Sequence, residues 1–260
     1  MPVDDPAARA RALHEARRTR VPIPPFTDED PTLGLADGYA IQEQLVPLLV
    51  ADGDRIVGYK VGVTSKAMQR MIGIDSPDYG PVLASTVFAD GDTIPLERFI
   101  QPKVEAEIVF VLGQELRGPG VTLTDARRAI AGAAAAMEIV DSRIEDWRIK
   151  LADTVADLAS NGAVATSSRL VSLDGLDPRL IGMAITRNGT LLDTGAGAAA
   201  LGDPVAVVAW LANVLGENGV ALEPGHLVMT GSLHAAEAME PGDVFRAEFD
   251  RLGAVTVRVK

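Results

Sequence analysis

The hydrophobic positions change their period along the chain, and the change separates a helical beginning from a strand-rich remainder. Between residues 35 and 51 the apolar side chains recur at i, i+4, i+7 and i+8, the spacing of one helix face. They are Ile41, Leu45, Leu48 and Leu49. Residues 8–18 predict an earlier helix, and the prolines in 21–31 indicate a stiff connector.

After residue 54 most apolar segments are typical of strands. Strands are expected at 55–63, 103–111 and 134–142, around a turn within 85–96, and as hairpins at 183–195 and 243–260. Three helices interrupt them: one capped by Thr124 and reaching about Gly132, one at 152–160, and one opened by Asp203 and Pro204. A short helix is expected at 66–73 and an irregular loop at 74–81.

These elements predict an α+β protein. A helical N-terminal subdomain, residues 1–53, would pack on a mixed-sheet body, residues 54–260. No helix-strand unit repeats with a fixed period, and no long linker separates the two parts.

Composition and charge narrow the class of protein. The net charge of −12 argues against nucleic acid as a partner and disfavours anionic membrane surfaces. The absence of cysteine excludes disulfides, thiolate catalysis and cysteine-ligated zinc. The charged N-terminus does not look like a secretory signal, and the small apolar run 129–137 is too short to span a bilayer. We therefore expect a cytoplasmic protein.

The predicted strand 103–111 carries two glutamates among apolar residues. Side chains alternate along a strand, so Glu105 and Glu107 project to one face together with Lys103. A solvated outer face is the simplest interpretation. Val109, however, continues the same face with an apolar side chain, which favours burial. Two buried carboxylates roughly 7 Å apart by strand rise would repel each other unless a cation lay between them.

Glu138 is a third carboxylate in an apolar segment. Alone, it would be expected to pair with a basic residue such as Arg143. Together with Glu105 and Glu107 it suits a hard cation, magnesium or manganese, because such ions prefer oxygen ligands.

Lys60 and Asp78 each allow two interpretations. Lys60 lies in a strand that otherwise looks buried, and is either an edge lysine reaching to water or a group that positions a proton or an anionic substrate. Asp78 is either a turn residue or a proton-handling partner of Lys60.

Other motifs carry little weight. The GxGxxA pattern within 195–202 does not open a helix, and residues 230–234 (TGSLH) do not match a hydrolase elbow. The histidines show no metal-ligand spacing, and both tryptophans are expected to pack rather than to stack on a ligand. These residues are His14, His226, His234, Trp147 and Trp210.

Five segments together resemble one enzyme family, in order and with its spacing. They are residues 58–80, 101–112, 137–157, 194–213 and 242–258. The sequence resembles the 2-hydroxypenta-2,4-dienoate (2-keto-4-pentenoate) hydratases and their sister 2-oxo-3-enedioate decarboxylases, within the fumarylacetoacetate hydrolase superfamily. The resemblance runs from about residue 35 to the C-terminus.

The resemblance implies a mixed β-roll and a metal site, Mg²⁺ or Mn²⁺. The metal would be held by Glu105, Glu107 and Glu138. Lys60 and Asp78 would handle protons on the other side of the substrate. Ser160 and Ser232 are the expected substrate-binding residues, with Ser232 near the substrate carboxylate.

The resemblance also implies an activity. The expected enzyme is a hydratase of aromatic catabolism that converts a 2-hydroxy-dienoate to a 4-hydroxy-2-oxo acid, acting as a homo-oligomer. A decarboxylase of 2-oxo-3-enedioates is the alternative; it should need an extra basic group, and none stands out in these segments. A non-catalytic partner subunit is disfavoured because all five site residues are present. Leu158 stands where relatives usually have asparagine and Asn161 follows Ser160, which bears on the substrate if that segment lines the pocket.

Overall fold

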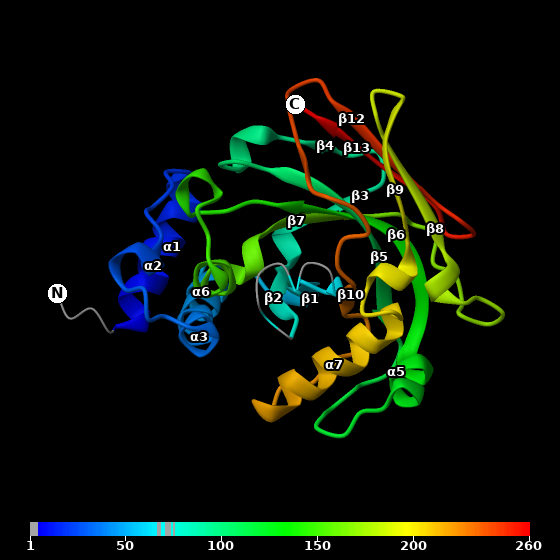
Figure 1. The fold of residues 1–260 in the computed structure, drawn as a ribbon, viewed down its shortest axis with the longest axis horizontal. Coiled ribbons are helices and arrows are strands. Elements are labelled where there is room, and N and C mark those ends of the chain that lie inside the picture. Colours follow the sequence, from blue (N-terminus) through cyan, green and yellow to red (C-terminus); the bar gives the residue numbers. More distant parts are fainter. Residues whose placement is uncertain (1–4, 67–68, 71–73, 75) are drawn as a thin grey trace.

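Two mixed β-sheets form the body of the protein (Figure 1). The computed structural model describes residues 5–66, 69–70, 74 and 76–260. Within these ranges the larger sheet has the order β2-β1-β10-β5-β6-β7-β3, and β11 pairs with β5. Its strands are β1 (Ile56–Gly62), β2 (Asp78–Leu83), β3 (Val87–Ala89), β5 (Lys103–Leu112), β6 (Ile130–Val140), β7 (Asn161–Thr166), β10 (Leu227–Met229) and β11 (Glu237–Ala238).

The second sheet packs on the first and has the order β4-β13-β12-β8-β9 in the described part of the chain. Its strands are β4 (Thr93–Ile94), β8 (Gly182–Arg187), β9 (Thr190–Ala196), β12 (Val244–Phe249) and β13 (Gly253–Val259). The predicted hairpins at 183–195 and 243–260 are β8–β9 and β12–β13. Apolar residues on the facing sides of both sheets, such as Ile108, Phe110, Phe245 and Val257, belong to one buried cluster.

Helices cover the remaining faces. The N-terminal α1 (Pro6–Thr19), α2 (Phe26–Glu29) and α3 (Leu35–Ala51) lie with α6 (Leu151–Ala156) on one side of the sheets in Figure 1, and α5 (Leu123–Ala129) and α7 (Pro204–Glu217) lie on another. Short 3-10 turns connect the strands: η1 (Ala84–Thr86), η2 (Leu96–Arg98), η3 (Glu145–Trp147), η4 (Leu158–Ser160), η5 (Pro178–Leu180) and η6 (Gly197–Ala199).

The N-terminal helices share a core with later parts of the chain. The predicted apolar face of α3 is buried through Ile41, Leu45 and Leu49, in a cluster that also contains Leu83 and Leu158. Helix α3 therefore packs against residues far along the sequence, and the subdomain boundary at residue 53 remains a prediction.

Helix α7 is a core helix. The stretch from Gly197 to Glu217 is long and apolar enough to cross a membrane by composition, but half of it is buried in the fold. Its apolar residues, such as Val208 and Leu211, join the main cluster. Asp203 caps the helix and Pro204 begins it, as predicted.

Several predicted elements are wrong in their bounds, among them the helix at 152–160, which ends at Ala156. Thr122, not Thr124, caps α5, which ends at Ala129, and β6 begins at once with Ile130. The strand predicted at 134–142 therefore begins earlier than expected, because the residues before it pair with β5. The loop expected at 74–81 gives way to β2 at Asp78 because this segment pairs with β1. The short helix expected at 66–73 lies mostly outside the described residues.

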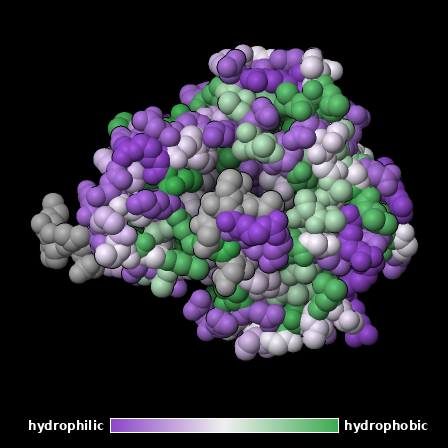
Figure 2. Space-filling view, in the orientation of Figure 1, coloured by the Kyte–Doolittle hydropathy of each residue, from purple (hydrophilic) through white to green (hydrophobic). Residues whose placement is uncertain are grey.

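The outer surface is mixed in character. Figure 2 shows hydrophilic residues spread over one face, with hydrophobic residues in small groups between them. A recess opens near the middle of this face. The chemically distinctive residues lie inside the fold, on β1, β2, β5 and β6.

Candidate active site

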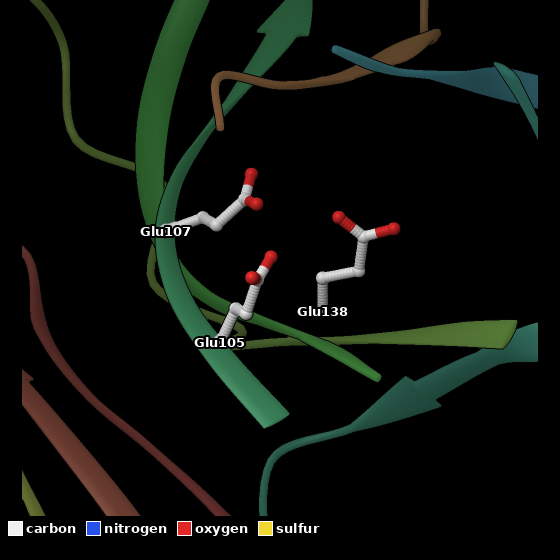
Figure 3. A group of neighbouring side chains, drawn as sticks. All are labelled: Glu105, Glu107 and Glu138. Atoms are coloured by element: carbon white, nitrogen blue, oxygen red, sulfur yellow. The ribbon is translucent and has the colours of Figure 1, made fainter. Parts of the chain in front are cut away.

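Three glutamate carboxylates converge on one point of the larger sheet. Glu105 and Glu107 on β5 and Glu138 on β6 each offer an oxygen within 4.8 Å of the other two. Figure 3 shows the three side chains pointing into the same space. Glu107 and Glu138 are buried and Glu105 is half-buried, so the solvated outer face considered from sequence is excluded.

The register of β5 and β6 brings the carboxylates together. Glu105 lies directly opposite Glu138, and Glu107 is opposite Ala136 on the same face. Like charges directly opposite in an antiparallel pair destabilise a sheet. The neighbouring residues on the sheet are apolar, and Val109, Ala134 and Met229 belong to one buried cluster. The arrangement therefore requires compensating positive charge.

The electrostatics of the cluster reflect this crowding. Burial and the negative charge of Glu138 raise the pKa of Glu105 to about 7, although Lys60 opposes the shift. Burial, Glu138 and Glu105 raise the pKa of Glu107 well above its usual range. One charge on Lys60 does not balance three carboxylates.

The donor set fits a divalent metal. Glu107 Oε1 and Glu138 Oε2 are buried and have no hydrogen-bond partner among the described residues. Glu107 Oε2 accepts from Gly231 N at 2.9 Å, which fixes the carboxylate and leaves its other oxygen free. Oxygen-only ligands with no soft atoms suit Mg²⁺, Mn²⁺ or Ca²⁺.

Lys60 is a buried interior lysine. Strand β1 pairs with β2 on one side and with β10 on the other, so the edge-strand interpretation is wrong. Its Nζ lies 3.4 Å from Glu138 Oε1 and donates to Ala159 O at 2.9 Å. Lys60, and not Arg143, is thus the basic partner of Glu138. Burial alone would lower the pKa of Lys60, but the charges of Glu138 and Asp78 raise it, so the ammonium stays charged.

Asp78 faces the same space from β2. It lies opposite Gly62 in the β1–β2 pair, and Gly80 lies opposite Lys60. A Cβ on Gly62 would come within 2.2 Å of Asp78 Oδ1, so the glycine makes room for the carboxyl group. Burial raises the pKa of Asp78, with Lys60 opposing, and its Oδ1 has no hydrogen-bond partner among the described residues.

The segment after α6 is a left-handed turn that sequence analysis missed. Leu158, Ala159 and Ser160 have φ of 56°, 52° and 56°. This left-handed conformation raises the backbone energy of a residue with a Cβ by about 1–2 kcal/mol. The turn directs the carbonyl of Ala159 to Lys60. Leu158 is fully buried in the hydrophobic cluster that it shares with α1 and α3. Its side chain therefore does not line the cavity, whereas Ala159 and Ser160 do.

Asn161 completes this segment. Its Nδ2 donates to Glu138 Oε1 at 2.9 Å. Sequence analysis noted Asn161 only as a departure from the family pattern, and assigned it no role. Only the pairing of β6 with β7, which sets Glu138 opposite Val164, brings the amide to the carboxylate.

The two serines are both at the cavity, with their hydroxyls partly engaged. Ser160 Oγ lies 2.9 Å from Thr154 Oγ1. Ser232 Oγ donates to His234 O at 2.6 Å, so it has only acceptor capacity left. His234 Nε2 accepts from Ala106 N at 2.8 Å, which assigns the ring proton to Nδ1.

One cavity of about 1050 Å³ gathers these groups. Of the predicted site residues, it is lined by Lys60, Asp78, Glu105, Glu107, Ser160 and Ser232. Glu138 lies behind them, joined to Lys60 and opposite Glu105.

The cavity also has lining residues that sequence analysis set aside. His234 and Trp147 both reach it, although we expected scattered structural roles for the histidines and packing for the tryptophans. Lys103 Nζ lies 4.5 Å from the centre of the Trp147 ring. Lys103 and Lys150 also line the cavity; both lie in the segments in which no extra basic group stood out from the sequence. The sequence did contain a sign of this: Lys103 lies two residues before Glu105, and so on the same face of the strand.

Known proteins resemble this chain over nearly its whole length. Residues 61–260 match the family described as fumarylacetoacetate (FAA) hydrolase C-terminal. The chain is 42% identical over 246 residues to a 2-keto-4-pentenoate hydratase of Paraburkholderia xenovorans, covering 95% of this chain and 91% of that protein. It is 38% identical over 255 residues to a 2-oxo-hept-4-ene-1,7-dioate hydratase of Escherichia coli, covering 96% of each.

A solved structure confirms the fold. The 4-oxalocrotonate decarboxylase from Pseudomonas putida G7, complexed with magnesium and adipate, superposes with a TM-score of 0.94 at 35% identity, covering 98% of this chain and 97% of that one. The predicted α+β fold and the predicted relationship to hydratases are both confirmed. The chain therefore belongs to the fumarylacetoacetate hydrolase family, among relatives named as hydratases of unsaturated 2-oxo acids.

Proposed function

We propose that the protein is a divalent-metal-dependent hydratase of 2-hydroxypenta-2,4-dienoate or a close 2-hydroxy-dienoate, with a 4-hydroxy-2-oxo acid as product. The observation that supports this most is the position of a three-carboxylate cluster together with buried Lys60 and Asp78 at one cavity. The 2-oxo acid made during the reaction carries adjacent oxygens, which suit a hard cation with open positions.

Glu105, Glu107 and Glu138 would hold Mg²⁺ or Mn²⁺. When bound, the metal supplies Lewis-acid stabilisation of negative charge on the substrate oxygens. Gly231 N and Asn161 Nδ2 hold Glu107 and Glu138 in place. The Ser232 hydroxyl can accept a hydrogen bond, and we propose that Ser160 and Ser232 help to position the substrate.

Lys60 and Asp78 would handle the protons. The dienol loses its 2-hydroxyl proton and gains a proton at C5; water then adds at C4 while C3 takes a proton. The raised pKa of Asp78 makes its carboxyl group easier to protonate than an ordinary aspartate, which suits a group that accepts and returns protons. Lys60 stays charged, and so would act as a hydrogen-bond donor toward developing negative charge.

Product analysis tests the proposal directly. Metal-loaded protein incubated with 2-hydroxypenta-2,4-dienoate should give 4-hydroxy-2-oxopentanoate, identified by mass and NMR. Failure to consume this acid or a close 2-hydroxy-dienoate in the presence of Mg²⁺ or Mn²⁺ would contradict it.

A second candidate is the decarboxylation of a 2-oxo-3-enedioate. Lys103 and Lys150 favour it, because they line the cavity and make no ion pair among the described residues, and a second carboxylate would find a positive partner there. The same lysines suit hydration of a diacid. With 2-hydroxymuconate as substrate, CO₂ release would support the decarboxylase, and a hydrated diacid would support the hydratase.

A further inference from the structure

A second, smaller cavity lies between helix α1 and the body of the protein. It measures about 200 Å³ and its lining includes four arginines: Arg17, Arg20, Arg98 and Arg143. Asp141 is the acidic residue that lines it. In a chain of net charge −12, such a concentration of positive charge needs an explanation.

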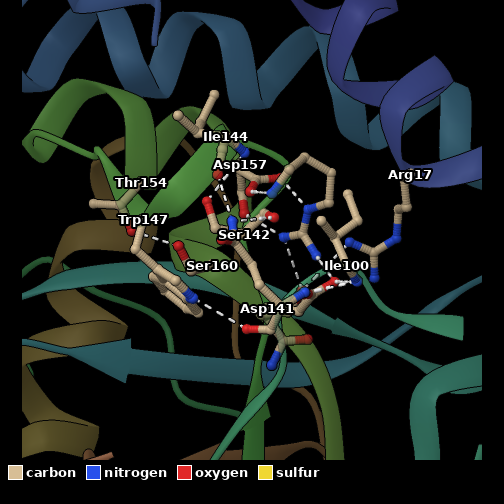
Figure 4. A network of polar contacts seen from close by, with 12 residues as sticks. Arg17, Ile100, Asp141, Ser142, Ile144, Trp147, Thr154, Asp157 and Ser160 are labelled. Atoms are coloured by element: carbon tan, nitrogen blue, oxygen red, sulfur yellow. Dashed lines mark hydrogen bonds and ion pairs between the residues drawn. The ribbon is translucent and has the colours of Figure 1, made fainter. Parts of the chain in front are cut away.

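The carboxylates around this cavity already have partners. Asp141 accepts from Gln101 N at 2.8 Å and from Ile100 N at 3.1 Å, and it lies 3.5 Å from Arg143 Nη1. Arg143 donates to Asp157 at 2.6 Å. Figure 4 shows this network, with Arg17 entering from the neighbouring helix. Arg143 is therefore neutralised inside the network.

The other three arginines form no close pair with a carboxylate in the described part of the chain. Arg17, Arg20 and Arg98 make no ion pair within the described ranges of the chain. Each donates to backbone carbonyls instead: Arg17 to Asn161 O at 3.3 Å, Arg20 to Glu97 O at 2.8 Å and Arg98 to Ser85 O at 3.0 Å. A guanidinium carries five N–H donors, so most of these donors remain available.

The environment of Arg17 works against its charge. Burial and the positive charge of Arg143 lower the pKa of Arg17 to about 10, although the nearby charges of Asp157, Asp141 and Asp54 oppose the shift. An anion beside Arg17 would remove this penalty, and planar guanidinium groups bind carboxylate and phosphate oxygens in a bidentate manner. Since a water occupies about 30 Å³ in the liquid, the cavity has room for a small oxyanion with a few waters but not for a nucleotide.

We propose that this arginine cavity binds a small oxyanion, a phosphate or a short carboxylate, through Arg17, Arg20 and Arg98. The site is separate from the carboxylate cluster, although Asn161 connects them: its carbonyl accepts from Arg17, and its side chain donates to Glu138. The proposal does not depend on the identity of the substrate.

Calorimetric titration of the metal-loaded, 260-residue protein tests the site. Inorganic phosphate and acetate serve as separate probes, which distinguishes a phosphate site from a carboxylate site. We expect saturable binding of one of them at millimolar or lower concentration, and at least a tenfold loss of affinity in Arg20→Gln and in Arg98→Gln. Arg11→Gln is the matched control, because Arg11 is exposed on the same helix and pairs with Asp5; it should bind as the wild type does.

The hydratase activity without added anion should stay within about twofold of wild type in Arg20→Gln and Arg98→Gln, since neither residue lies in the catalytic cavity. Absence of saturable binding would overturn the proposal, as would equal affinity in all the variants. Dissociation of an oligomer in both arginine variants, with no binding of either probe to the wild type, would assign the cavity to a contact between subunits and also overturn it.

Discussion

At the scale of single residues, the buried pair of Lys60 and Glu138 sits beside two further carboxylates. Removing one partner of a buried ion pair usually costs several kcal/mol because the other charge is left uncompensated. Here Glu138 has a second possible partner, the metal, while Lys60 has Asp78 nearby. Metal binding and proton handling are therefore separable by mutation.

The first prediction concerns the metal. Glu107→Gln keeps the side-chain size but removes a negative charge from the cluster, so Mg²⁺ affinity should fall at least tenfold and the activity of chelator-treated protein should no longer recover at low Mg²⁺. Calorimetric titration measures the affinity. Glu237→Gln, outside the cluster, is the control. Full turnover by wild-type protein in excess EDTA with no retained metal would contradict the metal site.

The second prediction concerns proton handling. Asp78→Asn and Lys60→Gln should lower kcat by about 10²–10⁴-fold, the usual contribution of a positioned acid or base. Mg²⁺ affinity should be retained in Asp78→Asn. It should be equal or tighter in Lys60→Gln, because the ammonium no longer competes for Glu138. Steady-state kinetics with metal titration checks both results. A change confined to KM would mean that these residues only bind substrate.

At the scale of elements, the strand pairings and close approaches decide where these side chains point. The β1–β2 pair sets Gly62 opposite Asp78 and Gly80 opposite Lys60. A Cβ on Gly80 would lie 2.0 Å from Leu158 O, so the backbone of the left-handed turn η4 is in close contact with β2. Strand β2 and η4 thus form one unit that supports both catalytic candidates.

The third prediction follows from this packing. Gly62→Ala would place its Cβ on the Asp78 carboxyl group, so Asp78 must turn away and kcat should fall at least tenfold while Mg²⁺ affinity is retained. Gly182→Ala is a matched control on another strand, because no atom lies within 4 Å of its added Cβ. Equal kcat in both variants would show that the position of Asp78 is not critical.

The fourth prediction concerns the β8–β9 turn. Asp243 accepts hydrogen bonds from Arg187 Nε, Asn188 Nδ2 and Glu240 N. Asp243→Asn should lower the free energy of unfolding by about 2 kcal/mol at neutral pH, as expected for hydrogen bonds to a charged group. The Arg187 hydrogen bond lowers the pKa of Asp243 below its usual 3.8.

The pH dependence of this effect has a definite sign. A depressed folded-state pKa gives stability that is present above pH 3.8 and is lost as the pH falls through the folded-state pKa. The difference between wild type and Asp243→Asn in urea unfolding should therefore be full at pH 6 and shrink below pH 4. The exposed Asp250→Asn is the control. A difference that grows toward low pH would contradict the assignment.

At the scale of the whole molecule, the fifth prediction is assembly into dimers or larger oligomers. Several apolar side chains are exposed in the single chain, including Leu180 at 72%, Val21 at 62% and Leu191 at 59%. Association would cover part of this surface. Light scattering at micromolar concentration measures the mass. A monomer under these conditions would contradict the prediction.

The sequence by itself determined much of this protein. The 3.6-residue period predicted α3 with its buried face, and Asp203 and Pro204 predicted the start of α7. Turn residues predicted the first hairpin and alternation predicted the second, because all these signals are local. Alternation along residues 103–111 placed Glu105 and Glu107 on one face. The family resemblance then predicted a metal site and a hydratase before any contact was known.

Only the tertiary structure decided how distant segments meet. The register that sets Glu105 opposite Glu138 and the interior position of Lys60 depend on pairings between strands. The burial of Leu158 away from the cavity depends on its packing in the same cluster as the N-terminal helices. The position of the Asn161 amide beside Glu138 depends on the pairing of β6 with β7. Lys103 reaches the cavity from β5, and Lys150 from the start of α6. The conformational preferences of individual residues carry no information about such contacts. The register of a strand is selected by the free energy of burying all the apolar side chains on one of its faces together.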